Sequence, residues 1–265
     1  MLTKVTSSGT TTYGWDYENR LTSVTLPGTG GTLGFKYDAF GRRVQKVFAQ
    51  GSSTMTTNYR YNGRNAADDV DQNANVLARY AGTQNIDEPL AELRSGTTSY
   101  YEQDGLGSVT SLTTSAGGLG NTYTYDSFGR LAASSGSIAN RFQYSAREFD
   151  IETGLYYYRA RYYDSSTGRF LSEDPIAWVG GSANFYDYVG NDPVSLADPT
   201  GLYPNKTPEP PGGPPMPVPG DPGSQWAWNP NSGDSRNGTY RPSPWNGSGQ
   251  QPSVNWDPND GGTGI

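Results

Sequence analysis

A short pattern returns along this chain, and it constrains the fold more than any other feature. It reads aromatic, any residue, aromatic, Asp, two residues, Gly, Arg and then, directly or after one more residue, Leu or Val, and full copies occupy residues 35–44 and 123–131. Degenerate copies occupy residues 15–21, 59–64 and 104–109. In two pairs of neighbouring copies the Asp residues lie 22 residues apart. A fixed period of this length is the signature of a repeat architecture rather than of one compact core.

Each copy of the pattern predicts a β-hairpin. Aromatic residues at alternate positions, such as Tyr123 and Tyr125, lie on one face of a strand. The Asp side chain can accept hydrogen bonds from its own turn, and the Gly supplies a positive φ. A single hairpin cannot bury its aromatic face, so neighbouring hairpins must stack. We therefore expect a mostly β chain in which the repeated Asp and Arg residues serve the turns and have no catalytic role.

The composition agrees with strands and turns, and it removes several classes of chemistry. Gly (35), Tyr (20) and Pro (19) are abundant, which favours short strands and tight turns over helices. The chain has no Cys and no His, so disulfides, thiolate metal sites and histidine-dependent catalysis are excluded, and we expect neither a metal nor a cofactor. The net charge of −7 predicts that the repeats do not bind nucleic acid. No apolar run reaches the length of a transmembrane helix, and the first residues lack the apolar stretch of a signal peptide.

The segment from Arg147 to Leu202 is dense in aromatic and arginine residues. It contains the stretches ETGLYYYRARYYD (152–164), STGRFLSEDP (166–175) and DPTGL (198–202). These stretches resemble the core-associated segment of Rhs/YD-repeat proteins, and the hairpin copies resemble the YD repeats of the same family. The resemblance implies hairpins that form part of a spiralling β-sheet shell, followed by a Pro/Gly-rich, largely irregular tail. The implied divisions are a YD-repeat shell segment (1–141), a core-associated segment (142–202) and a linker with a short variable tail (203–265).

The same resemblance implies a site of self-cleavage. In related toxin shells the core-associated segment is a self-acting aspartyl protease that cuts after the Leu of Asp-Pro-x-Gly-Leu. Matched residue by residue, Asp174 and Asp198 are the two acids and Arg161 is the supporting arginine. The scissile bond then joins Leu202 to Tyr203. Two adjacent carboxylates do not both ionise easily, so one can hold a proton while the other activates a water, and a nearby guanidinium can offset negative charge.

The residues alone leave two interpretations of these aspartates open. Asp-Pro is a common way to start a turn, so Asp174 and Asp198 can both be turn caps. The family usually has Gly where this chain has Ala177. If that position needs a positive φ, Ala strains the turn beside Asp174.

Other charged residues of the chain predict structural roles. Arg159 and Arg169 alternate with tyrosines, which favours stacking on aromatic rings and ion pairs with acids of the same segment, namely Glu148, Glu152 and Asp164. Residues 87–93 (DEPLAEL) resemble a connecting strand region of the family and hold no group of chemically active side chains.

The composition changes abruptly at Tyr203. Fourteen of the nineteen prolines lie in residues 203–265, so residues 204–222 are predicted to form an extended, polyproline-type linker. Beyond it, W-x-W-x-P, S-R-x-G-T-Y and W-D-P elements are weakly similar to a small predicted polymorphic-toxin module. The His-Trp-Asp element that usually follows is missing, and composition favours a tail without a packed core. Ser235 and Arg236 are the tail residues that we would test for activity.

The resemblance as a whole implies the C-terminal part of an Rhs-type polymorphic toxin used in competition between bacteria. Its shell would enclose a C-terminal cargo and release it by a single self-cleavage after Leu202, with no turnover of other substrates. Expected partners are the upstream shell or the cargo, an immunity protein and a component of a secretion system, for a full-length protein that is secreted or held at the cell surface. The alternative is a non-catalytic, truncated or displaced repeat scaffold that binds partners or surface glycans through tyrosine-rich faces.

Overall fold

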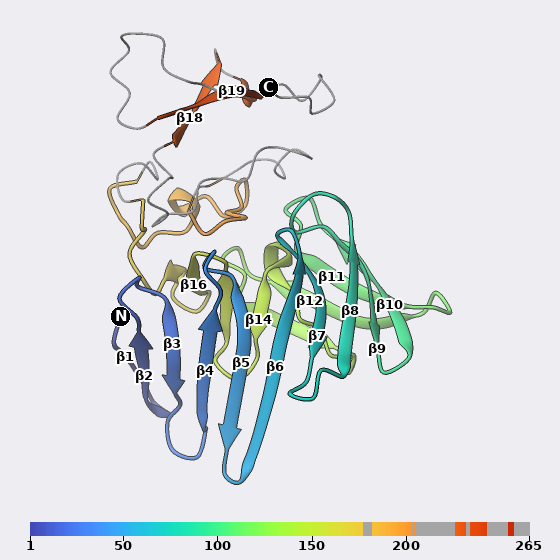
Figure 1. The fold of residues 1–265 in the computed structure, drawn as a ribbon. Helices are drawn as coiled ribbons and strands as arrows, with labels where there is room; N and C mark the ends of the chain where they lie inside the picture. The colour runs from blue at the N-terminus through green and yellow to red at the C-terminus, as the bar shows by residue number, and fades with distance from the viewer. Residues whose placement is uncertain (177–181, 203, 205–225, 232–233, 243–253, 257–265) are drawn as a thin grey trace. The chain divides into compact units, whose positions relative to one another are not determined.

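The computed structural model describes residues 1–176, 182–202, 204, 226–231, 234–242 and 254–256 (Figure 1). The chain divides into two units, Met1–Pro208 and Glu209–Ile265. Among the described residues of the first unit, the strands form two antiparallel sheets of unequal size.

The larger sheet, the wall, has thirteen strands that lie side by side in chain order, each antiparallel to the next. They are β1 (Thr3–Thr6), β2 (Gly9–Trp15), β3 (Leu21–Thr25), β4 (Thr32–Tyr37), β5 (Arg43–Gln50), β6 (Ser53–Asn62), β7 (Asn65–Val70), β8 (Val76–Gly82), β9 (Pro89–Arg94), β10 (Thr97–Gln103), β11 (Val109–Thr114), β12 (Leu119–Tyr125) and β13 (Leu131–Ser135). Stacked hairpins produce this order, so the prediction of a mostly β, hairpin-built chain is confirmed. The two edges of the wall are β1 and β13.

The repeated Asp builds the turn in the copies that contain it, as predicted, and the full copy at 35–44 is an example. Asp38 Oδ1 accepts the backbone N–H groups of Phe40 and Arg42, and Asp38 Oδ2 accepts a bond from Arg42 Nε at 2.7 Å. Gly41 has a φ of 75°, which a residue with a side chain adopts only under strain. In the degenerate copy at 15–21, Asn19 takes the glycine's place with a φ of 59°, a region that Asn tolerates better than most residues. The Asp and Arg of a repeat therefore bind each other within a single turn.

The smaller sheet packs against the wall and carries the tyrosines of the core-associated segment. Its strands are β14 (Glu148–Asp150), β15 (Leu155–Tyr158), β16 (Arg161–Asp164) and β17 (Arg169–Phe170), flanked by the 3₁₀ turns η1 (Tyr144–Ala146) and η3 (Val189–Asn191). Because side chains alternate across a strand, Tyr157 and Tyr162 face the apolar side chains of β2–β4. Tyr156 and Tyr163 face the other way and pack around Tyr188. These tyrosines are buried, so they form a core and not an exposed binding face.

A buried layer of charged side chains joins the wall to the smaller sheet. Arg43 of β5 is 1% exposed and pairs with Asp150 at 2.5 Å and with Glu148 at 2.8 Å. Burial alone would raise the pKa of Glu148, but Arg141 and Arg43 lower it to about 2. Buried charges are tolerated only when they are paired in this way. The acids of β14 therefore depend on the wall for part of their counter-charge.

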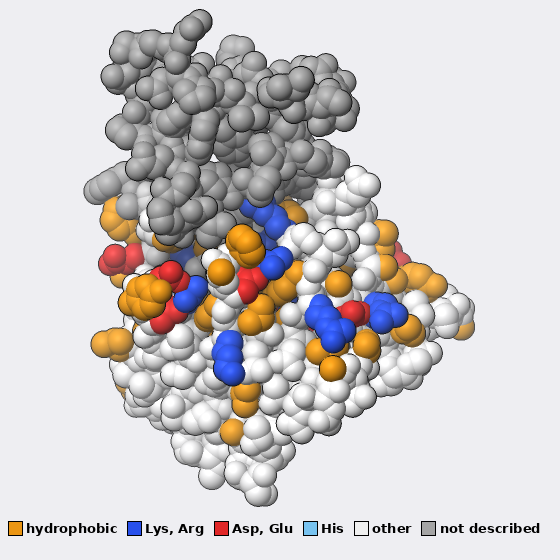
Figure 2. All heavy atoms as spheres, viewed as in Figure 1, with side chains coloured by type: hydrophobic (Ala, Val, Ile, Leu, Met, Phe, Trp, Pro, Cys, Tyr) orange, Lys and Arg blue, Asp and Glu red, His pale blue; other side chains and the backbone are white. Residues whose placement is uncertain are grey.

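The surface of the described residues carries mixed charges. On the face shown in Figure 2, basic side chains stand singly or beside acidic ones, and uncharged atoms cover most of the rest. A phosphate backbone is held by a continuous field of basic groups, and this face does not present one. None of the helices in the described part of the chain is long and apolar enough to cross a membrane.

The described residues of the second unit form one small sheet inside the region predicted to be largely irregular. Its strands are β18 (Trp226–Asn231), β19 (Asp234–Pro242) and β20 (Val254–Trp256), in that order and antiparallel. Trp228 pairs with Tyr240, and Gly238 pairs with Trp256. The sheet therefore joins backbone from all three elements of the tail that the sequence singled out, and Ser235 and Arg236 lie in β19.

Candidate active site

The three side chains that the family resemblance singled out lie together in the structure. Arg161 Nη2 is 3.0 Å from Asp174 Oδ2 and 3.5 Å from Asp198 Oδ2. The side chains of Arg161 and Asp198 are almost fully buried, and that of Asp174 is 10% exposed. One guanidinium nitrogen thus contacts two carboxylates that are far apart in the sequence.

Arg161 is held at the start of β16 by contacts on several sides. Its Nε donates to the carbonyl oxygen of Gly201 at 2.5 Å, and its Nη1 donates to that of Phe185 at 3.2 Å. Its guanidinium carbon lies 3.7 Å from the ring centroid of Phe170. Burial lowers the pKa of Arg161, and the charges of Asp198 and Asp174 oppose this effect. The arginine is therefore fixed against the chain that leads to Leu202.

Asp198 organises the turn before the predicted scissile bond. Its Oδ1 accepts the backbone N–H groups of Gly201 at 2.8 Å and Leu202 at 3.1 Å. Gly201 is required there, because its φ is 75° and an added Cβ would lie 2.2 Å from the carbonyl oxygen of Tyr158. The turn-cap interpretation and the catalytic one are compatible, since Oδ1 serves the turn while Oδ2 faces Arg161.

Asp174 lies in the same cluster, and its ionisation is perturbed. Its Oδ1 accepts the N–H of Ile176 at 3.0 Å, and its own N–H donates to the carbonyl oxygen of Phe185 at 2.9 Å. Burial raises the pKa of Asp174 above its ordinary value, although the charge of Arg161 opposes the shift. A raised pKa extends the pH range in which the carboxyl keeps its proton. Ala177, which follows in the sequence, lies outside the described residues.

A cavity of about 70 Å³ adjoins the cluster. Its lining includes Arg161, Asp174, Asp198 and Leu202, together with residues between 182 and 190. The space is polar and large enough for water, so a nucleophile can lie beside both carboxylates. Tyr203, on the far side of the predicted scissile bond, lies outside the described residues.

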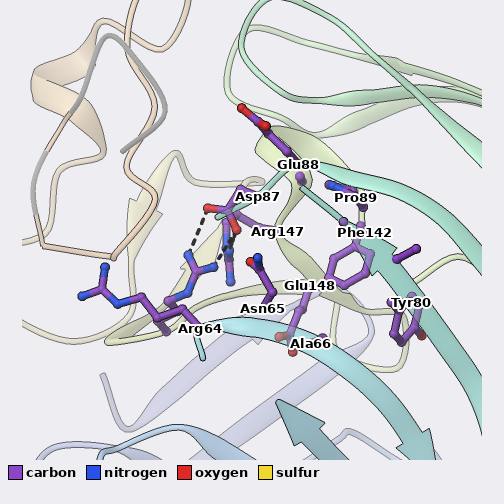
Figure 3. A pocket seen from close by; sticks show the side chains of 14 residues that line it. Arg64, Asn65, Ala66, Tyr80, Asp87, Glu88, Pro89, Phe142, Arg147 and Glu148 are labelled. Atoms are coloured by element: carbon purple, nitrogen blue, oxygen red, sulfur yellow. Dashed lines mark hydrogen bonds and ion pairs between the residues drawn. The ribbon is translucent and has the colours of Figure 1, made fainter. Parts of the chain in front are cut away.

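A further charged group, absent from the sequence prediction, lies close to this site. Asp87 follows β8 in the wall and binds Arg147 of the core-associated segment, and both are labelled in Figure 3. Asp87 also binds Arg159 of the same segment. Arg159 also donates to the carbonyl oxygen of Pro199. The sequence analysis singled out no side chain in residues 87–93, and these ion pairs of Asp87 are seen only in the folded unit. No local sequence signal marks Asp87, because both of its partners are distant in the chain.

The ion pairs predicted inside the core-associated segment are largely replaced by pairs to the wall. Arg159 pairs with Asp87 at 2.7 Å. Glu152 pairs with Lys46 at 2.9 Å, and Asp164 pairs with Lys4 at 2.5 Å. These partners lie on β1, on β5 and in the loop between β8 and β9, and a pattern within one segment cannot reveal them.

Comparisons with known proteins show what the chain as a whole is similar to. Residues 15–53 match the family model described as RHS Repeat. The tRNA3(Ser)-specific nuclease WapA of Bacillus spizizenii is 36% identical over 207 residues, which are 75% of this chain and 9% of that protein. The probable deoxyribonuclease RhsA of Dickeya dadantii is 31% identical over 203 residues, 72% of this chain and 14% of that protein.

A solved structure shares the fold. The crystal structure of TcdB2-TccC3-TEV superposes with a TM-score of 0.60 at 26% sequence identity, and the match covers 72% of this chain and 10% of that one. The chain therefore spans about a tenth of the length of the proteins that it matches.

Proposed function

The chain is an Rhs/YD-repeat protein related to Rhs-type polymorphic toxins, and we propose that it is the C-terminal part of a toxin shell. We further propose that this shell cuts itself once, between Leu202 and Tyr203. The observation that carries the proposal is the pair of carboxylates, Asp174 and Asp198, on one nitrogen of Arg161. Leu202 lines the cavity beside them and donates its N–H to Asp198. The two carboxylates therefore lie beside the backbone that leads to the bond which we propose is cut.

Hydrolysis of this peptide bond needs one base and one acid. We assign the proton to Asp174, because burial raises its pKa, and the ionised role to Asp198, because the N–H groups around it stabilise a carboxylate. Asp198 takes a proton from a water, whose oxygen attacks the carbonyl carbon of Leu202. Asp174 gives its proton to the amide nitrogen as the C–N bond breaks, which leaves a carboxyl group on Leu202 and an amine on Tyr203.

Arg161 supports both events without exchanging a proton. Its Nε holds the carbonyl of Gly201, so the backbone before the scissile bond cannot drift away from the carboxylates. Its charge also offsets the negative charge that develops when water adds to the carbonyl.

The product of the cut is the segment that begins at Tyr203, and we propose that it is the cargo or the link to the cargo. The upstream shell would continue the wall by pairing with the edge strand β1, because an unpaired strand edge is a template for another strand. An immunity protein and a secretion component complete the set of partners for a toxin that works outside the producing cell. The nuclease activities in the relatives' names belong to those proteins, and we propose none for the wall.

Intact mass spectrometry of the purified chain tests the self-cleavage. We expect two species, residues 1–202 and 203–265, and only the uncut chain for Asp174→Asn, because an amide at this position cannot supply the acid's proton. The variant should keep the fold, since its amide oxygen can still accept the N–H of Ile176. If wild type stays whole, both alone and behind an upstream wall from the family, the non-catalytic scaffold replaces this proposal.

The rate of cleavage is expected to depend on pH through Asp174. Its folded-state pKa is raised from 3.8, so the protonated form that the mechanism needs is lost only as pH rises through that higher value. Protonation of the base lowers the rate on the acid side, which gives a bell-shaped profile. First-order rates measured from about pH 3 to about pH 8 check this expectation. A rate that continues to rise with pH would contradict the assignment of the proton to Asp174.

A further inference from the structure

The loop between β8 and β9 brings a wall carboxylate against two arginines of the core-associated segment. Asp87 Oδ1 accepts a bond from Arg159 Nη2 at 2.7 Å, and Asp87 Oδ2 accepts one from Arg159 Nη1 at 3.0 Å. Asp87 Oδ1 also binds Arg147 Nη1. Figure 3 labels Asp87 and Arg147 and draws dashed contacts at the carboxylate of Asp87. A two-point pair between Arg and a carboxylate fixes orientation as well as charge.

The second contact of Arg159 reaches the chain that is to be cut. Its Nη1 donates to the carbonyl oxygen of Pro199, which lies in the Asp198–Leu202 turn. On the same turn, the N–H of Ala160 donates to the carbonyl oxygen of Thr200 at 3.2 Å. The hairpin end between β15 and β16 therefore holds the turn by its backbone and by the Arg159 side chain.

Asp87 is itself held by several strands of the wall. Gln103 of β10 donates to the backbone carbonyl of Asp87 at 3.2 Å. Asn65 of β7 donates to the carbonyl of Asn85 at 2.9 Å, and Asn85 binds Glu88 within the loop. The position of Asp87 thus depends on β7, β8, β9 and β10 being paired. A wall in which these strands are not assembled would not present the carboxylate.

The negative charge of Asp87 offsets the repulsion between two neighbouring arginines. Arg147 is 2% exposed and Arg159 is 21% exposed by their side chains, and the two repel each other. The other acids near them, Glu148 and Glu88, have partners of their own, since Glu148 pairs with Arg43 and Arg141. Removal of the Asp87 charge therefore leaves two like charges together, which favours rotation of the more exposed Arg159 toward solvent and away from Pro199.

We propose that Asp87 is a positioning residue that couples the assembled wall to self-cleavage, through Arg159 and the carbonyl of Pro199. The inference rests on the proposed function, because its readout is the cut after Leu202. Asp87 touches none of the reacting groups and acts only by keeping the Asp198–Leu202 turn in place. Cleavage thereby becomes conditional on strands β7–β10, the last of which ends at Gln103, far upstream of the scissile bond in the sequence.

The test measures first-order cleavage rates of the full chain by intact mass spectrometry, alongside thermal unfolding of each variant. We expect Asp87→Asn to slow cleavage by a factor of about 10 to 100, because displacement of a reacting chain by about 1 Å costs up to about 10²-fold. Asp87→Glu should restore most of the rate, since it restores the charge. Arg159→Gln should slow cleavage as Asp87→Asn does, and the double variant should be no slower than either single one, because both break one connection.

The control is Asp68→Asn, which removes a carboxylate of β7 whose ion-pair partner, Arg79, is on the surface. This variant should be cleaved at the wild-type rate. A wild-type rate in both Asp87→Asn and Arg159→Gln overturns the coupling while the proposed function stands. Additive losses in the double variant, or no rescue by Glu, also overturn it in favour of a general loss of stability. If wild type itself is not cut after Leu202, the proposed function and this inference fail together. Should Asp87→Asn not fold, the Arg159→Gln rate decides.

Discussion

Replacing Asp198 with Asn is expected to slow self-cleavage by about a thousandfold, within the 10²–10⁴ range of a general acid–base group. The amide cannot take a proton from water, so the attack on Leu202 loses its base. Its carbonyl oxygen can still accept the N–H groups of Gly201 and Leu202, which bind Oδ1 in the native turn. The change therefore removes the chemistry and keeps the local structure.

Two further variants separate the loss of the base from the loss of the local structure. Asp198→Ala removes the acceptor as well, so it should stop cleavage and also lower the melting temperature, whereas Asp198→Asn should change the melting temperature little. Asp192→Asn is the matched control, because Asp192 begins another Asp-Pro pair but is exposed. Mass spectrometry over time should show wild-type cleavage for Asp192→Asn. Undiminished cleavage in Asp198→Asn would falsify the role of Asp198 as the base.

Replacing Arg43 with Ala is expected to reduce the free energy of unfolding by about 3–5 kcal/mol, the usual cost of removing one partner from a buried ion pair. Arg43 lies between Glu148 and Asp150, and its guanidinium faces the rings of Tyr59 at 4.9 Å and Tyr157 at 4.6 Å. The variant leaves two buried carboxylates short of a counter-charge and leaves space between the wall and β14.

Denaturant unfolding followed by tyrosine fluorescence measures this loss. Arg42→Ala is the control next in sequence, because Arg42 is 38% exposed and pairs with Asp38 within its own turn. Its loss should cost no more than about 1 kcal/mol, the range of exposed ion pairs. Equal stability of the two variants would show that the buried layer does not join the wall to the smaller sheet.

The neighbouring arginines Arg42 and Arg43 show which contacts can be predicted from the sequence and which cannot. The spacing of Asp38 and Arg42 is part of the repeat, so the turn that they build could be predicted from ten residues. Arg43 looks like another member of the same run, yet its side chain enters the core and meets acids more than a hundred residues away. Its role depends on which face of β5 turns inward, and that is settled when the smaller sheet packs against the wall.

The candidate site shows the same division. The family resemblance singled out Arg161, Asp174 and Asp198, and the structure brings these side chains together. It did not single out Asp87, whose loop has an ordinary polar sequence. Asp87 gains its significance from Arg147 and Arg159, which approach it only in the folded unit.

The sequence by itself determined the hairpins of the repeat copies and their turns, because each depends on contacts between residues a few positions apart. Asp38 and Arg42, or Asn19 in the place of a glycine, carry that information locally. Only the tertiary structure decided which charges are paired, where water can reach Asp174 and Asp198, and that the turn before Leu202 is tied to the wall through Asp87. These features depend on long-range packing of one sheet against another, where the energy of a buried charge is set by neighbours that the local pattern does not specify.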